Sequence, residues 1–285
     1  MRRALTVLAT GAQLLVQDLG RPGYAHLGVP PSGALDQPAL RLANRLVGNA
    51  ENAAGLEALL GGVRLRAECS CTVAITGPDV PVRMAGRAVD THTPLHLAAG
   101  AELSVGAPGH GLRNYLAVGG GVAAQPELGS LATDVLSGLG PAPVRAGDVL
   151  ALGAATGPPS GVDQLPYPSI PGRLVVDLLL GPRDDWFSDP AGQLTGHDWS
   201  VTAQSNRVGL RLSGEPLRQL DCETQLPSEP VRTGAVQVPP NGQPVIFLAD
   251  HPTTGGYPVI GVVDATALPA LAQARPGSII HFQPR

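Results

Sequence analysis

Residues 226–260 read LPSEPVRTGAVQVPPNGQPVIFLADHPTTGGYPVI, and this stretch decides the fold that the sequence predicts. The run Val245–Ala249 is short, apolar and rich in β-branched and aromatic residues, and it is bounded by Pro244 and Asp250, which is typical of a buried strand. Before it, the segment PPNG at 239–242 predicts a tight turn, because proline fixes φ and Asn-Gly tolerates positive φ. The stretch therefore predicts a β-hairpin within a fold of short strands.

Polar residues and glycines follow this strand and form a candidate site. The segment TTGGY at 253–257 supplies two hydroxyls (Thr253, Thr254), two glycines that let a backbone approach a ligand, and the phenol of Tyr257, which can cap a cavity. Four more polar side chains lie near turns around the same strand, where scaffolds usually carry functional groups: Glu229, Gln237, Asp250 and His251. On residue types alone, a hairpin followed by a Gly-rich connection without chemistry fits equally well.

The composition favours a mainly β protein. The chain has 285 residues, and its 37 glycines and 29 prolines are interleaved with short runs of Val, Leu and Ile. Such a pattern predicts many short strands joined by tight turns, with a few short helices. The segment GAATGPPSGVDQLPYPSIPG at 153–172 is dense in proline and glycine and shows no periodicity, so we interpret it as a linker between an N-terminal β lobe (1–152) and a C-terminal β lobe (173–285).

Individual elements can be predicted in both lobes. Asp36 is a candidate N-cap, and Pro38 in the first turn and an apolar face up to Val47 predict a helix of about three turns that ends at Gly48-Asn49. A second short helix is expected at 264–274. Strands are expected at 57–65, 72–76, 95–97, 102–105, 113–118, 149–152, 173–180, 278–282 and after a turn at 205–207.

The absence of lysine excludes several functions. All 19 basic residues are arginines, so the chain has no amine for a Schiff base, for a Walker-type phosphate loop or for a biotin or lipoyl carrier. A net charge of -4 without a basic stripe argues against nucleic acid as a partner. No apolar stretch approaches the ~20 residues that span a bilayer. The opening MRRALTVLATGAQLLV lacks a small-residue cleavage site, so we interpret it as a first strand and expect a cytoplasmic protein.

The cysteines and histidines do not predict a metal site. The chain has three cysteines, Cys69, Cys71 and Cys222, and an odd number does not build a disulfide framework. Cys69 and Cys71 are two residues apart, so on a strand they share one face, as small core residues do. His92 and His96 are the only close histidine pair, and Pro94 breaks the segment between them. We therefore expect no bound metal.

A second polar, glycine-rich segment follows the first strand at 17–36, QDLGRPGYAHLGVPPSGALD. Arg21 with Asp18 and Gln17 could clamp an anion or an amide, because guanidinium geometry matches carboxylate and phosphate oxygens. An ion pair between Asp18 and Arg21 that only stabilises the loop fits these residue types at least as well as an anion or amide clamp. Ser32 in the same segment is counted with the candidate substrate-binding residues.

Six motifs occur in order along nearly the whole chain: VQDLGRPG at 16–23, GVPPSGALD at 28–36, GPRDD at 181–185, PSE at 227–229, GAVQVPP at 234–240 and TTGGYP at 253–258. Together they resemble the biotin-dependent carboxyltransferase family, whose members include components of 5-oxoprolinase, the KipA proteins and modules of urea carboxylases. The resemblance implies a cyclophilin-like β-barrel architecture that works as one carboxyltransferase-like unit. It also implies two 5-oxoprolinase partners, a KipI-like B-type subunit and a further A-type subunit, with which the complex would hydrolyse a cyclic amide, 5-oxoproline, to glutamate at the expense of ATP.

The resemblance also suggests roles for the candidate residues. We expect Arg21 to bind a substrate carboxylate, Gln237 and Thr254 the amide edge, and Asp250 or Glu229 to handle a proton. Gln17, Ser32, Thr253 and Tyr257 would complete the substrate-binding set. The family often has an arginine where this chain has His251, so the resemblance does not extend to a role that needs a permanent cation at this position.

Two other functions stay open at this stage. The chain could be part of a carboxyltransferase that passes a carboxyl group from biotin, carried by another protein, to a urea-like amide. It could also be a regulator that binds a KipI-like kinase inhibitor without turnover. We expect no cofactor to bind this chain alone, with ATP used by the complex and biotin required only by the carboxyltransferase alternative.

Overall fold

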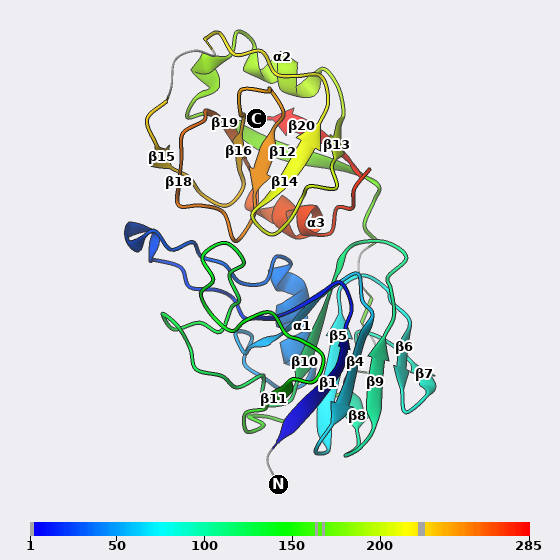
Figure 1. Cartoon of the computed structure of the whole chain (residues 1–285). Coiled ribbons are helices and arrows are strands. Elements are labelled where there is room, and N and C mark those ends of the chain that lie inside the picture. Colours follow the sequence, from blue (N-terminus) through cyan, green and yellow to red (C-terminus); the bar gives the residue numbers. More distant parts are fainter. Residues whose placement is uncertain (1–2, 163–164, 167–168, 222–225) are drawn as a thin grey trace. The chain divides into compact units, whose positions relative to one another are not determined.

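The computed structural model describes residues 3–162, 165–166, 169–221 and 226–285. Two compact units account for the chain (Figure 1). The first unit comprises Met1–Arg21, Asp36–Asp134 and Gly138–Ile170, and the second comprises Pro22–Leu35, Val135–Ser137 and Pro171–Arg285. Most of the predicted linker therefore belongs to the first unit, and the second unit takes two short segments from the N-terminal half. Cys222 lies outside the described residues, as do positions 163–164 and 167–168 of the predicted linker.

The first unit contains two antiparallel sheets with the orders β11-β1-β4-β9-β6-β7 and β2-β3-β10-β5-β8. Buried side chains from both sheets, such as Leu5, Leu56 and Ile75, form one apolar core. The strands are β1 Ala4–Thr10, β2 Gln13–Gln17, β3 Gly55–Leu59, β4 Val63–Ala67, β5 Cys71–Thr76, β6 Val82–Met84, β7 Arg87–Val89, β8 Leu95–Leu97, β9 Glu102–Val105, β10 Arg113–Val118 and β11 Val149–Ala151.

Helix α1 (Gln37–Leu46) confirms the predicted helix and its cap. The Asp36 carboxylate accepts a hydrogen bond from the Ala39 amide at 3.1 Å, and Pro38 lies in the first turn. Ala43 and Leu46 pack with Ala74 of β5 and Ala117 of β10, so α1 covers the second sheet.

A buried polar network also ties the start of α1 to this sheet. The Asp36 amide donates to the Tyr115 hydroxyl at 2.8 Å, and this hydroxyl donates to Glu57 at 2.8 Å. Arg113 Nε lies 3.5 Å from the Glu57 carboxylate. Burial and the nearby Glu57 charge raise the pKa of Tyr115 well above its usual value, so the phenol stays protonated. Tyr115 is therefore a structural residue.

Two predicted strands are wrong. The opening segment, predicted as one first strand, forms β1 and β2 in different sheets, with Gly11 at positive φ between them. The other wrong strand is 57–65. The chain forms β3 and β4 in different sheets and turns between them at Leu60, Gly61 and Gly62, all with positive φ. A Cβ on Gly61 would lie 1.7 Å from the Gly106 carbonyl oxygen, so only glycine fits this turn.

The second unit is built around a closed barrel with the strand order β12-β19-β16-β17-β14-β13-β20 (Figure 1). A second apolar core fills it, with Trp199, Ile246 and Phe282 among its fully buried side chains. A mainly β architecture with a barrel and a few short helices is thereby confirmed. The strands are β12 Arg173–Leu180, β13 Trp199–Val201, β14 Gly209–Ser213, β15 Glu229–Pro230, β16 Ala235–Gln237, β17 Val245–Phe247, β18 Thr254–Gly255, β19 Val259–Val263 and β20 Ile279–Pro284. The helices are α2 Pro190–Thr195 and α3 Leu268–Ala272, with the short 3-10 turns η1 Ala25–Leu27, η2 Asp184–Trp186 and η3 Ala265–Ala267.

Candidate functional site

The stretch 226–260 forms five of the strands in the second unit, β15 to β19. β16 and β17 pair antiparallel through the predicted turn, and β16 also pairs with β19. Their outer side chains, among them Val245, Phe247 and Val259, form a small apolar cluster with Val231. The two-stranded ladder of β15 and β18 places Glu229 opposite Gly255.

Gln237 and Gly255 are in close contact at this ladder. The Gln237 side chain is 7% exposed, and its Nε2 donates to the Tyr257 carbonyl oxygen at 3.1 Å. A Cβ on Gly255 would lie 2.4 Å from Gln237 Nε2, so the absence of a side chain at 255 makes room for the amide. Gly255 thus sets the position of the Gln237 amide.

Arg183 and Glu229 form a two-pronged ion pair beside these residues. Arg183 Nε lies 3.0 Å from one carboxylate oxygen of Glu229, and Nη2 donates to the other. The Arg183 amide donates to the Val259 carbonyl oxygen at 2.9 Å, which holds the arginine next to the start of β19. The hydrogen bonds from Arg183 lower the pKa of Glu229, so this half-buried carboxylate is ionised at neutral pH.

We call Arg183, Glu229, Gln237, Gly255 and Tyr257 the Gly255 site. It offers a cation, a carboxylate and an amide, and Tyr257, whose carbonyl oxygen accepts from Gln237, is 47% exposed. Thr253 and Thr254 lie next to it: the Thr253 carbonyl oxygen accepts from the Val231 amide at 3.0 Å, and Thr254 is exposed opposite Pro230. The arrangement can hold a small polar molecule with donors and acceptors on one edge, such as an amide. Arg183 was not predicted as a site residue, although it lies in the GPRDD motif that contributed to the family resemblance.

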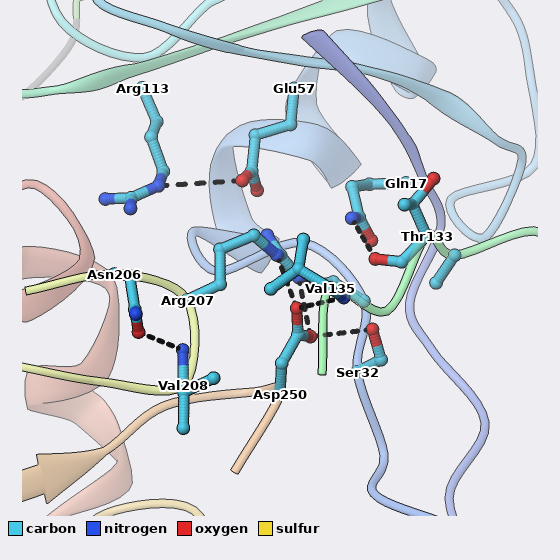
Figure 2. Close-up of polar contacts among 12 residues, drawn as sticks. Gln17, Ser32, Glu57, Arg113, Thr133, Val135, Asn206, Arg207, Val208 and Asp250 are labelled. Carbon is cyan, nitrogen blue, oxygen red and sulfur yellow. Dashed lines mark hydrogen bonds and ion pairs between the residues drawn. The ribbon is translucent and has the colours of Figure 1, made fainter. Parts of the chain in front are cut away.

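Asp250 belongs to a different, fully buried group (Figure 2). Arg207 Nε and Nη2 donate to its two oxygens at 2.8 and 3.0 Å, Ser32 Oγ donates at 2.8 Å, and the Val135 amide donates at 3.1 Å. Arg207 Nη2 also donates to the Gly33 carbonyl oxygen at 2.6 Å. We call Asp250, Arg207 and Ser32 the Asp250 latch.

This geometry argues against proton transfer by Asp250. Its side chain is 0% exposed, and four hydrogen bonds occupy its carboxylate, so no oxygen faces a substrate. The latch instead attaches the segments 22–35 and 135–137 to the rest of the second unit. Ser32, expected to bind substrate, is likewise a buried member of the latch. Nothing in the sequence pointed to Arg207, because it lies in a turn 43 residues from Asp250.

Gln17 and Arg21 lie in the first unit, where both side chains hold one loop. Gln17 Nε2 donates to the Thr133 carbonyl oxygen at 2.8 Å (Figure 2), and Arg21 Nη2 donates to the carbonyl oxygen of Ala132. The Asp18 carboxylate accepts from the Ser130 hydroxyl and the Leu131 amide, both at 2.7 Å. Among the described residues, no ion pair joins Asp18 to Arg21, and Arg21 Nη1 and Gln17 Oε1 have no hydrogen-bond partner. The two residues therefore have polar atoms to offer, but they are themselves buried.

His251 follows the latch and is also buried. Its Nδ1 lies 2.6 Å from the Pro252 carbonyl oxygen, which only a protonated Nδ1 can contact as a donor. The ring packs against Phe247, with centroids 5.8 Å apart. No group of three or more His, Cys, Asp or Glu side chains in the described part of the chain could hold a metal ion.

The same geometry can be compared with known proteins. The family model for the carboxyltransferase domain, subdomain A and B, matches residues 27–284, which include both the Gly255 site and the Asp250 latch. The chain belongs to the carboxyltransferase domain family. It is 37% identical to the C-type subunit of 5-oxoprolinase from Escherichia coli over 98% of this chain and 90% of that protein.

Solved structures of this family share the fold. The chain matches the crystal structure of TTHA0988 with a TM-score of 0.90 and 36% identity, and it matches the urea amidolyase of K. lactis with a TM-score of 0.91 and 31% identity. These matches cover 99% and 100% of this chain but only 55% and 19% of the two longer chains. The carboxyltransferase domain is thus found both as most of a separate protein and as a part of larger chains. Within the described residues, no helix of this member of the family is long and apolar enough to cross a membrane.

Proposed function

We propose that this chain is the C-type subunit of an ATP-dependent 5-oxoprolinase, a hydrolase that opens the cyclic amide 5-oxoproline to glutamate and is active only with its partner subunits. The observation that carries the proposal is the similarity to the E. coli protein, which extends over 98% of this chain at 37% identity. The proposed partners are the A-type subunit and the KipI-like B-type subunit. A complex that consumes ATP is expected in the cytoplasm.

The chemistry explains why ATP and several subunits are needed. A lactam carbonyl carbon is a poor electrophile, so it must be activated before water can attack it. In the activating step the carbonyl oxygen attacks the γ-phosphorus of ATP, ADP leaves, and the lactam becomes a phosphorylated imidate. Water adds to that carbon, the ring nitrogen takes up a proton and leaves, and a second water hydrolyses the acyl phosphate to glutamate and phosphate. Because this chain has no lysine and no Walker-type loop, we assign ATP binding to the complex and substrate orientation to this chain.

In this proposal the Gly255 site binds the amide edge of the lactam. The Gln237 amide and the exposed Thr254 hydroxyl pair with the carbonyl and N–H groups, Thr253 and Tyr257 border the ring, and ionised Glu229 accepts the proton that the reaction moves. Correct positioning of this kind is worth several kcal/mol, up to about 7–11 kcal/mol in well-oriented intramolecular reactions. Arg21, with its unpartnered Nη1, and Gln17 keep the proposed carboxylate-binding role as a separate hypothesis that an Arg21→Gln variant tests.

The test is reconstitution. The chain is mixed with the two purified partner subunits, and glutamate and ADP are measured with 5-oxoproline and ATP present. We expect both products only in the complete mixture. Equal product without this chain would overturn the proposal, and partner binding without any turnover would indicate a KipA-type regulator.

A biotin-dependent carboxyltransferase is the second candidate, favoured by the TM-score of 0.91 to the K. lactis urea amidolyase. In that case a urea-like amide would accept the carboxyl group from biotin carried on another protein. Avidin would block this activity, whereas it leaves ATP-driven lactam opening unchanged. The same reconstitution with avidin added therefore separates the two candidates.

Gly255→Ala is expected to reduce kcat/KM for 5-oxoproline about tenfold with little loss of stability. The new methyl group would displace the flexible end of Gln237, and one lost substrate hydrogen bond costs about 0.5–1.5 kcal/mol. Gly256→Ala is the matched control, because its Cβ would meet nothing nearer than 3.4 Å. Steady-state kinetics of the reconstituted complex measure both variants. Equal kinetics for the two variants would contradict a substrate role for Gln237.

A further inference from the structure

The outer face of β12 carries an unusual row of side chains for a barrel strand. Residues 174, 176 and 178 point into the core and are at most 6% exposed, whereas Val175 and Leu179 on the other face are 55% and 67% exposed. Both backbone edges of β12 are already paired, with β19 and β20. Val175 and Leu179 are four residues apart, which is about 13 Å along a strand, and half-buried Asp177 lies between them. The face thus presents an aliphatic, an acidic and a second aliphatic side chain in line.

A groove of about 260 Å³ adjoins this row. Its wall is formed by residues 174–177 of β12 on one side and by Asp264, Thr266, Ala267 and Ala270 of the η3–α3 segment on the other. The Asp264 carboxylate accepts from the Thr266 amide and hydroxyl at 2.9 and 2.6 Å, and these bonds lower its pKa, so it is charged at neutral pH. The groove therefore combines two carboxylates with alanine and aliphatic side chains; the described residues that line it include no basic one, and the Arg285 guanidinium reaches Asp177 from outside this set.

Size and charge together indicate what the groove accepts. Small-molecule sites usually occupy about 300–1,000 Å³, so this groove is small for a metabolite and suits one side chain. An arginine can lay its aliphatic stem on Ala267 and Ala270 and bring its guanidinium to a carboxylate. The chain itself shows this pairing, because the guanidinium of Arg285 donates to Asp177. Asp177 is therefore already placed to receive such a group.

We propose that this outer face of β12, with Val175, Asp177, Leu179 and the adjoining groove, is the docking surface for a protein partner in the complex. The occupant is a segment that places an arginine between two aliphatic side chains, so that the arginine replaces Arg285 at Asp177 and the aliphatic groups cover Val175 and Leu179. Arginine is enriched at protein interfaces relative to the rest of the protein surface, which fits an arginine as the group that Asp177 receives. The proposal rests on the proposed function, which requires partner subunits.

The test measures, by calorimetry, how the full chain binds the purified KipI-like partner. Val175→Thr/Leu179→Thr removes the aliphatic contact on solvent-exposed positions of a strand, where threonine is well tolerated. Asp177→Arg reverses the charge of the anchor. We expect each change to raise the Kd for the partner at least tenfold. The controls are Val149→Thr on β11, which at 62% exposure lies between Val175 and Leu179, and Asp90→Arg at an exposed aspartate; both should stay within twofold of the unmodified chain.

Each outcome decides the proposal. Loss of affinity in both test variants, with intact controls and unchanged thermal unfolding, supports it. Unchanged affinity in either test variant overturns it while the proposed function stands, because the unmodified chain still binds. No binding by the unmodified chain overturns the docking surface together with the proposed complex.

Discussion

Asp250→Ala is expected to lower the free energy of unfolding of the second unit by about 3–5 kcal/mol, because it removes one partner of a buried ion pair. Arg207 is 2% exposed, and its Nε and Nη2 both donate to the lost carboxylate. The Ser32 hydroxyl and the Val135 amide lose an acceptor as well. Both tryptophans, Trp186 and Trp199, belong to the second unit, so urea unfolding followed by tryptophan fluorescence measures this unit directly.

The double variant Asp250→Leu/Arg207→Met is the decisive control. Replacing both members of a buried ion pair with apolar side chains is often neutral or stabilising, so most of the lost stability should return. Glu102→Ala serves as the surface comparison: Glu102 pairs with Arg64 at 2.9 Å with about half of each side chain exposed, and such pairs contribute about 0–1 kcal/mol. Equal losses for Asp250→Ala and Glu102→Ala would show that the latch does not hold the unit together. If Asp250→Ala were as stable as the unmodified chain but its complex had lost turnover, Asp250 would be a catalytic residue.

Elements defined by local chemistry were predictable from the sequence. Helix α1 follows from the Asp36 cap, Pro38 and an apolar face, and β12 follows from the predominantly apolar run over residues 173–180. The turn that splits 57–65 into β3 and β4 is marked in the sequence by Gly61-Gly62, but the predicted strand ran through it. Its cause is the Gly106 carbonyl oxygen, which approaches Gly61 from a residue far away in the sequence.

In the candidate site, too, contacts between residues far apart in the sequence could not be predicted. Glu229, Gln237 and the 253–257 segment were predicted to gather around one strand, and the ladder of β15 and β18 brings Glu229, Gln237 and Gly255 together. The sequence did not distinguish these residues from Asp250. Asp250 is close to them in the chain, but its carboxylate accepts a hydrogen bond from Ser32, which is 218 residues away in the sequence. Residue types show what a side chain can do, whereas long-range pairing decides whether it faces a partner or a substrate.

Glu229→Gln is expected to reduce kcat of the reconstituted complex about 10²-fold or more, within the range of a lost proton-transfer group. Glutamine keeps the size of the side chain and can still accept from Arg183, but it cannot take up a proton. Glu102→Gln is the matched control, because it neutralises another surface carboxylate paired with arginine. Glutamate release in the presence of ATP and the two partner subunits measures both variants.

The pH dependence distinguishes proton transfer from a structural role of Glu229. The Arg183 hydrogen bonds lower the pKa of Glu229, so the carboxylate stays ionised and the activity is retained well into the acidic range, until the pH falls through that lowered pKa. Arg183→Gln removes the guanidinium, the pKa of Glu229 rises toward its ordinary value, and the acidic limb of the rate profile should move to higher pH. An acidic limb that does not move in Arg183→Gln, or a Glu229→Gln variant as active as Glu102→Gln, would show that Glu229 only anchors Arg183 and that the proton is handled elsewhere in the complex.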